Sequence, residues 1–259
     1  MKHLLPLLLI LPPAFTASAE SFTKPLREIT VSMGRSPHLM PYDNRPITLS
    51  CFFYSDLVVK ELNDPGLKGA AWTSVLPIHA GSKPECHVSH EAGEKVVNDF
   101  GGSFEGVKND FVFMRDADGL NGGIVFTVID WKSMTKLFSD NALFWDRRPI
   151  MERLTFSRSR KGELEIKYRR VAEADCSIPK DGMQCWHKIR KQFNLPSRNV
   201  PRCSGYKQRG QMKWEVGDPG IPPSDTDVPS AIVYPVITTL SSEPKTKAVR
   251  GQLTCSALE

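Results

Sequence analysis

The chain has 259 residues, of which 40% are hydrophobic and 24% charged, and its formal net charge is +5. This apolar content is sufficient for a buried core and excludes an intrinsically disordered chain. The length predicts one large domain or two small ones.

The first nineteen residues have the pattern of a cleaved secretory signal. Lys2 supplies a positive start, an apolar run extends from Leu4 to Leu11, and Ala17-Ser18-Ala19 provides small residues before the cut. The apolar run is shorter than the ~20 residues that span a bilayer. We therefore expect cleavage after Ala19 and an exported chain of residues 20–259. Since the sequence contains no Asn-x-Ser/Thr site, a bacterial periplasmic or secreted protein is favoured over a eukaryotic one.

Most segments of the exported chain have the composition of short β-strands. They are rich in β-branched and aromatic residues and are bounded by Gly, Pro, Asn or Asp. In residues 163–171, Leu164, Ile166 and Tyr168 alternate with charged residues, as in a half-buried antiparallel strand. The predicted strands cover residues 27–33, 46–55, 56–62, 70–78, 110–114, 123–130, 153–159, 163–171 and 231–240.

One helix is predicted after Asp181, which would act as its N-cap with Gln184 completing a capping box. Trp186, Ile189 and Phe193 follow at helical spacing and form an apolar stripe. Pro196 is expected to end this helix. A second, weaker helix is predicted over residues 131–138.

The predicted fold is therefore all-β and mainly antiparallel, with one or two short helices, arranged as an irregular sandwich or a propeller-like architecture. Residues 110–138 have the order of the inner strands of a propeller blade, but the pattern does not repeat at a fixed period, as a propeller requires. We expect a single β-rich domain over 20–259. The Pro-rich segment 216–230 is predicted to be an exposed loop or a boundary within it.

The exported chain contains six cysteines, an even number that predicts three disulfides in an oxidising compartment. Pro179 and the Asp181-Gly182 turn signal between the third and fourth cysteines suit a small closed loop. A sequential set then follows as one of the fifteen connectivities. It joins Cys51 to Cys86, Cys176 to Cys185 and Cys203 to Cys255.

The stretch ECHVSHE, residues 85–91, gathers Cys86, His87 and His90 between two carboxylates, with His79 upstream. Three histidines are a set that zinc or copper sites use. The zinc-protease pattern H-E-x-x-H is not met, because Glu94 stands where the second histidine is required. We expect a disulfide-tethered polar loop here, with a metal site formed by His79, His87 and His90 as the alternative.

No other catalytic motif is present, and the sequence predicts no cofactor. A nucleophile elbow, a phosphate-binding glycine loop and a dinucleotide fingerprint are all missing from the sequence. Asp116, Asp118 and Asn121 offer oxygen atoms that calcium prefers. An EF-hand loop counted from Asp116 would need glutamate at the position of Thr127, so a local turn is the preferred interpretation.

Charge gives the strongest indication of function. Residues 186–214 contain eight basic residues and no acid, and residues 144–170 contain nine basic residues and four acids. A basic region interleaved with aromatic residues favours an anionic partner. The predicted binding residues are Arg198, Arg202, Tyr206, Lys207 and Arg209.

We therefore expect a non-enzymatic exported protein that binds or scaffolds an envelope component. Its predicted partner is an anionic glycan, a lipid headgroup or an acidic protein, with nucleic acid disfavoured because the exported compartment normally lacks it. The alternative is an exported hydrolase, assisted by a metal ion on the three histidines.

Overall fold

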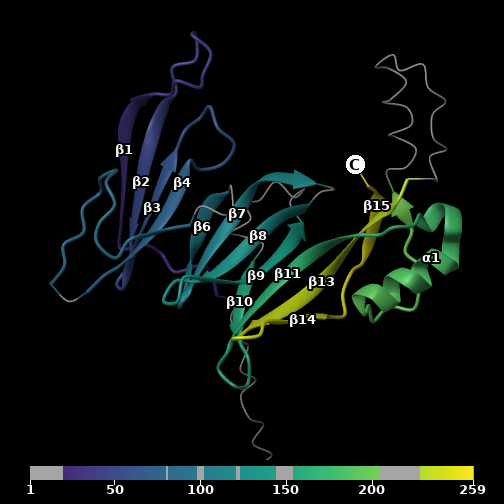
Figure 1. Ribbon diagram of the computed structural model, residues 1–259. Helices are drawn as coiled ribbons and strands as arrows, with labels where there is room; N and C mark the ends of the chain where they lie inside the picture. The colour runs from purple at the N-terminus through teal and green to yellow at the C-terminus, as the bar shows by residue number, and fades with distance from the viewer. Residues whose placement is uncertain are drawn as a thin grey trace, which may run out of the picture.

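The computed structural model of the chain describes residues 20–79, 81–97, 102–120, 123–143, 154–204 and 228–258 (Figure 1). These residues form two sheets and one helix, α1 (Ile178–Phe193). The five-stranded sheet contains, in spatial order, β1 (Arg27–Arg35), β2 (Pro46–Phe53), β3 (Leu57–Asn63), β4 (Trp72–Pro77) and β5 (Lys95–Val96).

The second sheet has ten strands and carries the rest of the chain. Its spatial order is β12-β15-β13-β11-β9-β8-β7-β6, with β10 paired to β11 and β14 paired to β13. Among the described strands, only β12 and β15 pair in parallel. The strands are β6 (Ser103–Lys108), β7 (Phe111–Leu120), β8 (Gly123–Asp130), β9 (Thr135–Leu143), β10 (Thr155–Arg158), β11 (Leu164–Glu173), β12 (Cys203–Ser204), β13 (Ser230–Leu240), β14 (Lys245–Ala248) and β15 (Thr254–Ala257).

The prediction of an all-β, mainly antiparallel fold is confirmed, and each of the nine predicted segments contains a strand. In β11 the predicted alternation holds, since Leu164, Ile166 and Tyr168 are buried while Lys167 is exposed. The propeller-like alternative is wrong for the described residues. Strands β7, β8 and β9 are consecutive strands of one open sheet, whereas a propeller would place them in a repeated blade.

The helix predicted over residues 131–138 is also wrong, because this segment is a tight turn followed by β9. The carboxylate of Asp130 accepts hydrogen bonds from the backbone N–H groups of Lys132 and Ser133, and Met134 has a positive φ of 54°. An aspartate that bonds its own following backbone in this way favours a turn over a helix. The chain therefore reverses here and pairs β9 with β8.

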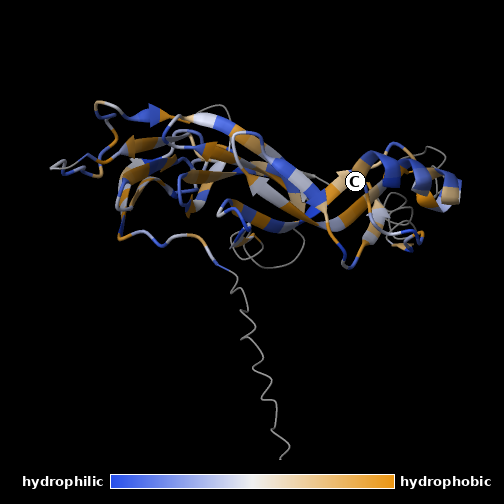
Figure 2. Cartoon of the chain, turned by 90° about the horizontal axis from the view of Figure 1, so that it is seen from below, coloured by the Kyte–Doolittle hydropathy of each residue, from blue (hydrophilic) through white to orange (hydrophobic). Residues whose placement is uncertain are grey.

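The two sheets pack face to face through one apolar cluster. Leu57, Val59 and Val75 from the five-stranded sheet contact residues of β6, β7 and β8, including Val112 and Met114. The opposite face of β7 and β8 belongs to the largest cluster, which also contains β10, β11, β13 and α1. Strands β7 and β8 are therefore buried on both faces. In Figure 2, hydrophilic and hydrophobic bands alternate along several strands of the two sheets.

Helix α1 covers one end of the ten-stranded sheet. The predicted apolar stripe is confirmed, since Trp186 and Ile189 have no exposed surface and Phe193 packs against the same cluster. The predicted start at Asp181 is wrong, because the helix begins at Ile178 after the N-cap Ser177. It is kinked at Gly182, whose φ of 53° suits glycine. It ends at Asn194 in the left-handed conformation, two residues before Pro196.

Three disulfides join distant and local parts of the fold. Cys51 pairs with Cys86, Cys176 with Cys185 and Cys203 with Cys255, which is the sequential set predicted from the sequence. Such bridges are typical of chains that fold outside the reducing cytosol. No helix in the described ranges is both long and apolar enough to cross a membrane.

Candidate functional site

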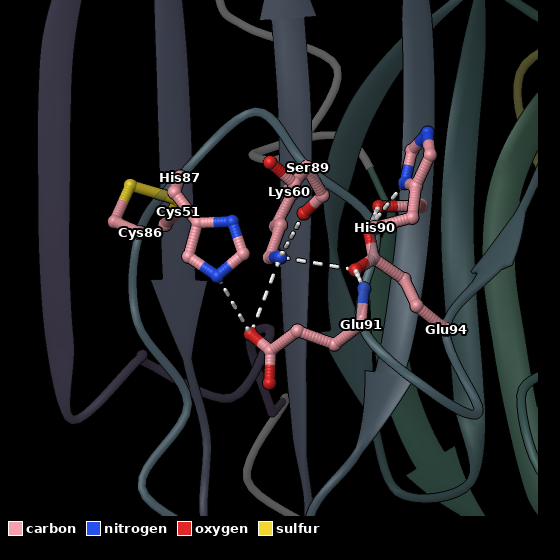
Figure 3. Close-up of polar contacts among 9 residues, drawn as sticks. Cys51, Lys60, Cys86, His87, Ser89, His90, Glu91 and Glu94 are labelled. Carbon is pink, nitrogen blue, oxygen red and sulfur yellow. Dashed lines mark hydrogen bonds and ion pairs between the residues drawn. A yellow bond between two sulfur atoms is a disulfide. The ribbon is translucent and has the colours of Figure 1, made fainter.

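The ECHVSHE stretch lies on the outer face of the five-stranded sheet, where its disulfide anchors it. Cys51 on β2 has no exposed surface and holds Cys86 at the start of the stretch. The chain then crosses the face of β3 and β4, which places Ser89, Glu91 and Glu94 above Lys60 (Figure 3). The stretch is therefore tethered by a disulfide, as predicted from the sequence, and it also covers this face of the sheet.

The centre of this cover is a buried ion pair between Lys60 and Glu94. The ammonium Nζ of Lys60 lies 3.0 Å from Oε2 of Glu94, and neither side chain has exposed surface. Lys60 also donates to the carbonyl oxygen of Ser89 at 3.3 Å and lies 3.4 Å from the carboxylate of Glu91. A buried ammonium needs this full set of acceptors because it has lost its hydration.

Glu94 is held as a carboxylate by four donors. Burial favours its neutral form, but hydrogen bonds from the Ser74 hydroxyl, the His90 ring, the Glu91 backbone N–H and Lys60 lower its pKa to about 2. The Glu91 N–H donates at 2.8 Å, and His90 Nδ1 lies 2.9 Å from Oε1. The carboxylate therefore stays charged throughout the physiological pH range.

The predicted metal site is not assembled. His90 faces Glu94, while Nε2 of His87 lies 3.5 Å from Glu91, so the two rings contact different carboxylates. His79 is exposed at the end of β4. Within the part of the chain that the structure describes, no group of three or more histidine, cysteine, aspartate or glutamate side chains is arranged to hold a metal ion. The close spacing in sequence instead reflects i, i+4 pairing of each histidine with a glutamate.

The oxygen-rich segment considered for calcium belongs to β7 itself. Asp118 forms an exposed ion pair with Lys68 at 2.9 Å, and its backbone N–H approaches the carboxylate of Asp116. Asn121 lies outside the described residues. Asp116 and Asp118 therefore lie within a strand and not in the local turn predicted from the sequence, and the ion pair of Asp118 joins it to a residue 50 positions away.

A second buried carboxylate, Glu61, was not identified from the sequence. It accepts hydrogen bonds from the backbone N–H of Phe104 on β6, from Asn63 at 2.8 Å and from the hydroxyl of Thr73. Burial raises its pKa, against the effect of these donors. Glu61 thus links the two sheets. Its signal in the sequence is the alternation of β3, which places it on the inward face with Leu57 and Val59.

The predicted basic region is described only in part. Arg198 and Arg202 follow α1, and both are exposed. The backbone carbonyl of Arg198 accepts a hydrogen bond from the indole of Trp186, so the segment is fixed to the helix by its main chain. Tyr206, Lys207 and Arg209 lie outside the described residues. Arg202 immediately precedes Cys203 on β12, which is the edge strand of the ten-stranded sheet beside β15.

A second basic surface forms on the outward face of β11, β13 and β14. Lys167 on β11 lies opposite Ile237 on β13, which lies opposite Lys247 on β14. Directly opposite residues share one face of a sheet, so the two ammonium groups flank Ile237. Arg169 lies two residues from Lys167 on β11, opposite Pro235, and Lys245 lies two residues from Lys247 on β14 in the other direction, opposite Thr239. We call these four residues the outer basic face: Lys167, Arg169, Lys245 and Lys247.

The outer basic face also contains Glu165, but in the described part of the chain its lysines are not paired with it. Among the described residues, no ion pair joins Lys167, Lys245 or Lys247 to a carboxylate, and all three are exposed. Arg169 donates to the carbonyl of Gln252 at 3.4 Å, which holds its side chain across the sheet. Glu165 lies two residues from Lys167 on the same face, opposite Thr239, which is opposite Lys245. Its carboxylate accepts a hydrogen bond from Ser157. Spacing in the sequence could not indicate that Lys167 and Lys247, about 80 positions apart, lie near each other.

A small polar hollow lies on the ten-stranded sheet. It measures about 190 Å³ and is lined by side chains of β7, β8 and β9, among them Asp116, Thr127 and Ser139. The hydroxyls of Thr127 and Ser139 bond each other at 2.7 Å. The hollow is smaller than the cavities of roughly 300 Å³ and more that usually enclose a small-molecule ligand.

No protein family, curated protein or solved structure matches this chain. The assignment of a function therefore depends on the charges and contacts described above.

Proposed function

We propose that this chain is an exported, non-enzymatic binding or scaffolding protein that docks an anionic component of the bacterial envelope through basic residues. The observation that carries the proposal is the exposure of Arg198 and Arg202 beside a structured helix end, continued in sequence by Lys207 and Arg209. Exposed cations on a rigid support attract anions over a Debye length of about 10 Å at moderate salt.

The aromatic residues of this region divide between core and surface roles. Trp186 is fully buried, and Phe193 is partly buried against Tyr234. They support the helix, so binding at this end is assigned to the charged side chains. A surface of this kind attracts its ligand through Coulomb forces that salt screens, and attachment should weaken as ionic strength rises.

Binding of the purified, oxidised chain to isolated envelope fractions at several salt concentrations tests the proposal. Reversal of Arg198, Arg202, Lys207 and Arg209 to glutamate should weaken attachment at least about tenfold, because repulsion replaces attraction. A matched control reverses Lys24, Lys68, Lys83 and Lys95, four exposed lysines near or within the other sheet. Equal loss in both variants, or loss in neither, would refute a specific role for the region after α1.

A further inference from the structure

We infer that the outer basic face is a binding surface for an extended acidic polysaccharide. The inference rests on the proposed function in one respect, because it takes the ligand to be anionic. It differs in assigning another surface of the protein and a polymeric ligand. Figure 1 shows β11, β13 and β14 as neighbours, in the part of the ten-stranded sheet that lies farther from β1.

The spacing of the charges favours a polymer over a single small anion. Lys167 and Arg169 are two residues apart on β11, which separates their attachment points by about 7 Å. Lys247 lies two strands away from Lys167, or about 10 Å across the sheet. The hollow of about 190 Å³ lies elsewhere, on β7, β8 and β9. A phosphate-sized ion would therefore contact one of them, whereas a chain with regularly repeated carboxylates can contact all four.

The lining between the charges suits a sugar chain. Ile237 lies between Lys167 and Lys247 and is half-buried, so it offers a small apolar surface against which a sugar ring can pack. Arg169 presents a guanidinium whose parallel N–H groups match a carboxylate, and its orientation is held by Gln252 and Thr254. The sheet face around Ile237 thus provides an apolar contact beside charges that are complementary to a carboxylate polymer.

A lipid bilayer fits this surface less well. Proteins that lie on membranes insert exposed Trp, Phe or Leu side chains below the headgroups. The exposed large hydrophobic residues of the described chain lie elsewhere, such as Met33 on β1 and Met40 and Tyr42 beyond it, with none on β11, β13 or β14. The basic face therefore carries the charges of a membrane surface binder without its apolar anchors.

The test measures binding of the oxidised chain to polygalacturonate, a linear polymer of acidic sugars, over a range of salt concentrations. The variant Lys167→Glu/Lys247→Glu should bind at least about tenfold more weakly, and the slope of log affinity against log salt should fall by about one to two. The control Lys24→Glu/Lys95→Glu makes the same change in net charge at two exposed lysines distant in sequence. It should bind as the parent does. Neither substitution touches the core, and a free-thiol assay verifies that the disulfides have formed.

Four outcomes separate this inference from the proposed function. Loss of binding in Lys167→Glu/Lys247→Glu alone supports it. If binding is lost only when Arg198, Arg202, Lys207 and Arg209 are changed to glutamate, the proposed function stands and the inference fails. If phosphatidylglycerol vesicles bind and polygalacturonate does not, or if inorganic phosphate competes as well as the polymer, the polymeric ligand is refuted. If no anionic probe binds, both proposals fail.

Discussion

Lys60 and Glu94 form an ion pair of 3.0 Å in which neither side chain reaches solvent. Lys60 lies on a central strand of the five-stranded sheet, and Glu94 lies in the segment that crosses it. Two charges removed from water stabilise a fold only while both are present, because a single charge that remains has no compensation. The pair therefore fixes the position of the covering segment at its middle, as the disulfide of Cys86 does near its start.

The first prediction concerns the loss of one partner. Lys60→Met or Glu94→Leu alone should lower the free energy of unfolding by about 3 kcal/mol, because each removes the fully buried ionic partner of a buried charge. The double variant Lys60→Met/Glu94→Leu should be less destabilised than the sum of the two. Lys68→Met is the control, since Lys68 pairs with Asp118 at the surface and its loss should change stability by less than about 1 kcal/mol.

Urea unfolding of the oxidised protein measures all four variants. If Lys60→Met is no more destabilising than Lys68→Met, the covering segment is not held by the buried pair. Additive effects in the double variant would mean that Lys60 and Glu94 act independently.

The second prediction is a pH dependence that Glu94 imposes. Its pKa is lowered from 4.5 to about 2 in the folded chain, so the unfolded state binds a proton first as the pH falls. The stabilisation by Glu94 is therefore complete above pH 5 and is lost between about pH 4.5 and 2. Parent protein should lose stability steeply in this interval, whereas Glu94→Gln should show a shallower decline. Parallel curves for the two proteins, measured by urea unfolding at each pH, would contradict the assignment.

The third prediction ranks the disulfides. A bridge restricts the unfolded chain more strongly as the loop that it closes becomes longer. The sequence separations are 52 residues for Cys203–Cys255, 35 for Cys51–Cys86 and 9 for Cys176–Cys185. Replacing both cysteines of a pair by serine should thus cost about 4 kcal/mol for the first two and about 3 kcal/mol for the last.

Thermal and urea unfolding of the three serine double variants give this ranking. The unreduced, denatured parent should also react with no thiol reagent, because all six cysteines are paired. Reaction of six thiols would contradict both the pairing and the expected oxidising compartment. A reversed ranking would show that native-state contacts of the short bridge outweigh its effect on the unfolded chain.

The strands were predictable because their signals are local, and among the disulfides only Cys176–Cys185 has such a local signal. Alternation in residues 163–171 and the β-branched run of 123–130 each suffice to identify a strand. The turn at residues 131–134 was missed because Trp131 and Phe138 have the spacing of two helical turns. The carboxylate of Asp130 outweighs that spacing by bonding the following N–H groups. Local side-chain bonds of this kind compete with a helix at little cost.

The sites were less predictable because they depend on pairing between distant strands. Lys167 and Lys247 come together only through β13, and no rule of spacing connects them. The histidines of the ECHVSHE stretch show the reverse case. Their clustering suggested one ion, yet each has a glutamate four residues later as a local partner. Composition thus identified the polar character of the segment, and only the fold determined which groups face each other.

The last prediction separates two buried carboxylates by the sign of their pH dependence. Burial raises the pKa of Glu61 above 4.5, so the folded chain keeps this proton more tightly than the unfolded chain does. The contribution of Glu61 is therefore greatest below pH 4.5 and is lost as the pH rises through its folded pKa. Glu61→Gln should gain stability relative to the parent between pH 4 and 7, whereas Glu94→Gln should lose relative stability between pH 2 and 5.

The size of the Glu61 effect follows from its bond to the second sheet. Glu61→Ala leaves the backbone N–H of Phe104 without its acceptor and should cost about 2 kcal/mol at neutral pH. Glu61→Gln keeps one oxygen for that N–H and serves as the matched control. Urea unfolding at pH 4 and pH 7 measures both variants. Equal pH dependence in Glu61→Gln and the parent would show that the Glu61 carboxylate does not titrate differently in the folded and unfolded chain. Equal stability of Glu61→Ala and Glu61→Gln would show that the bond to Phe104 does not hold the sheets together.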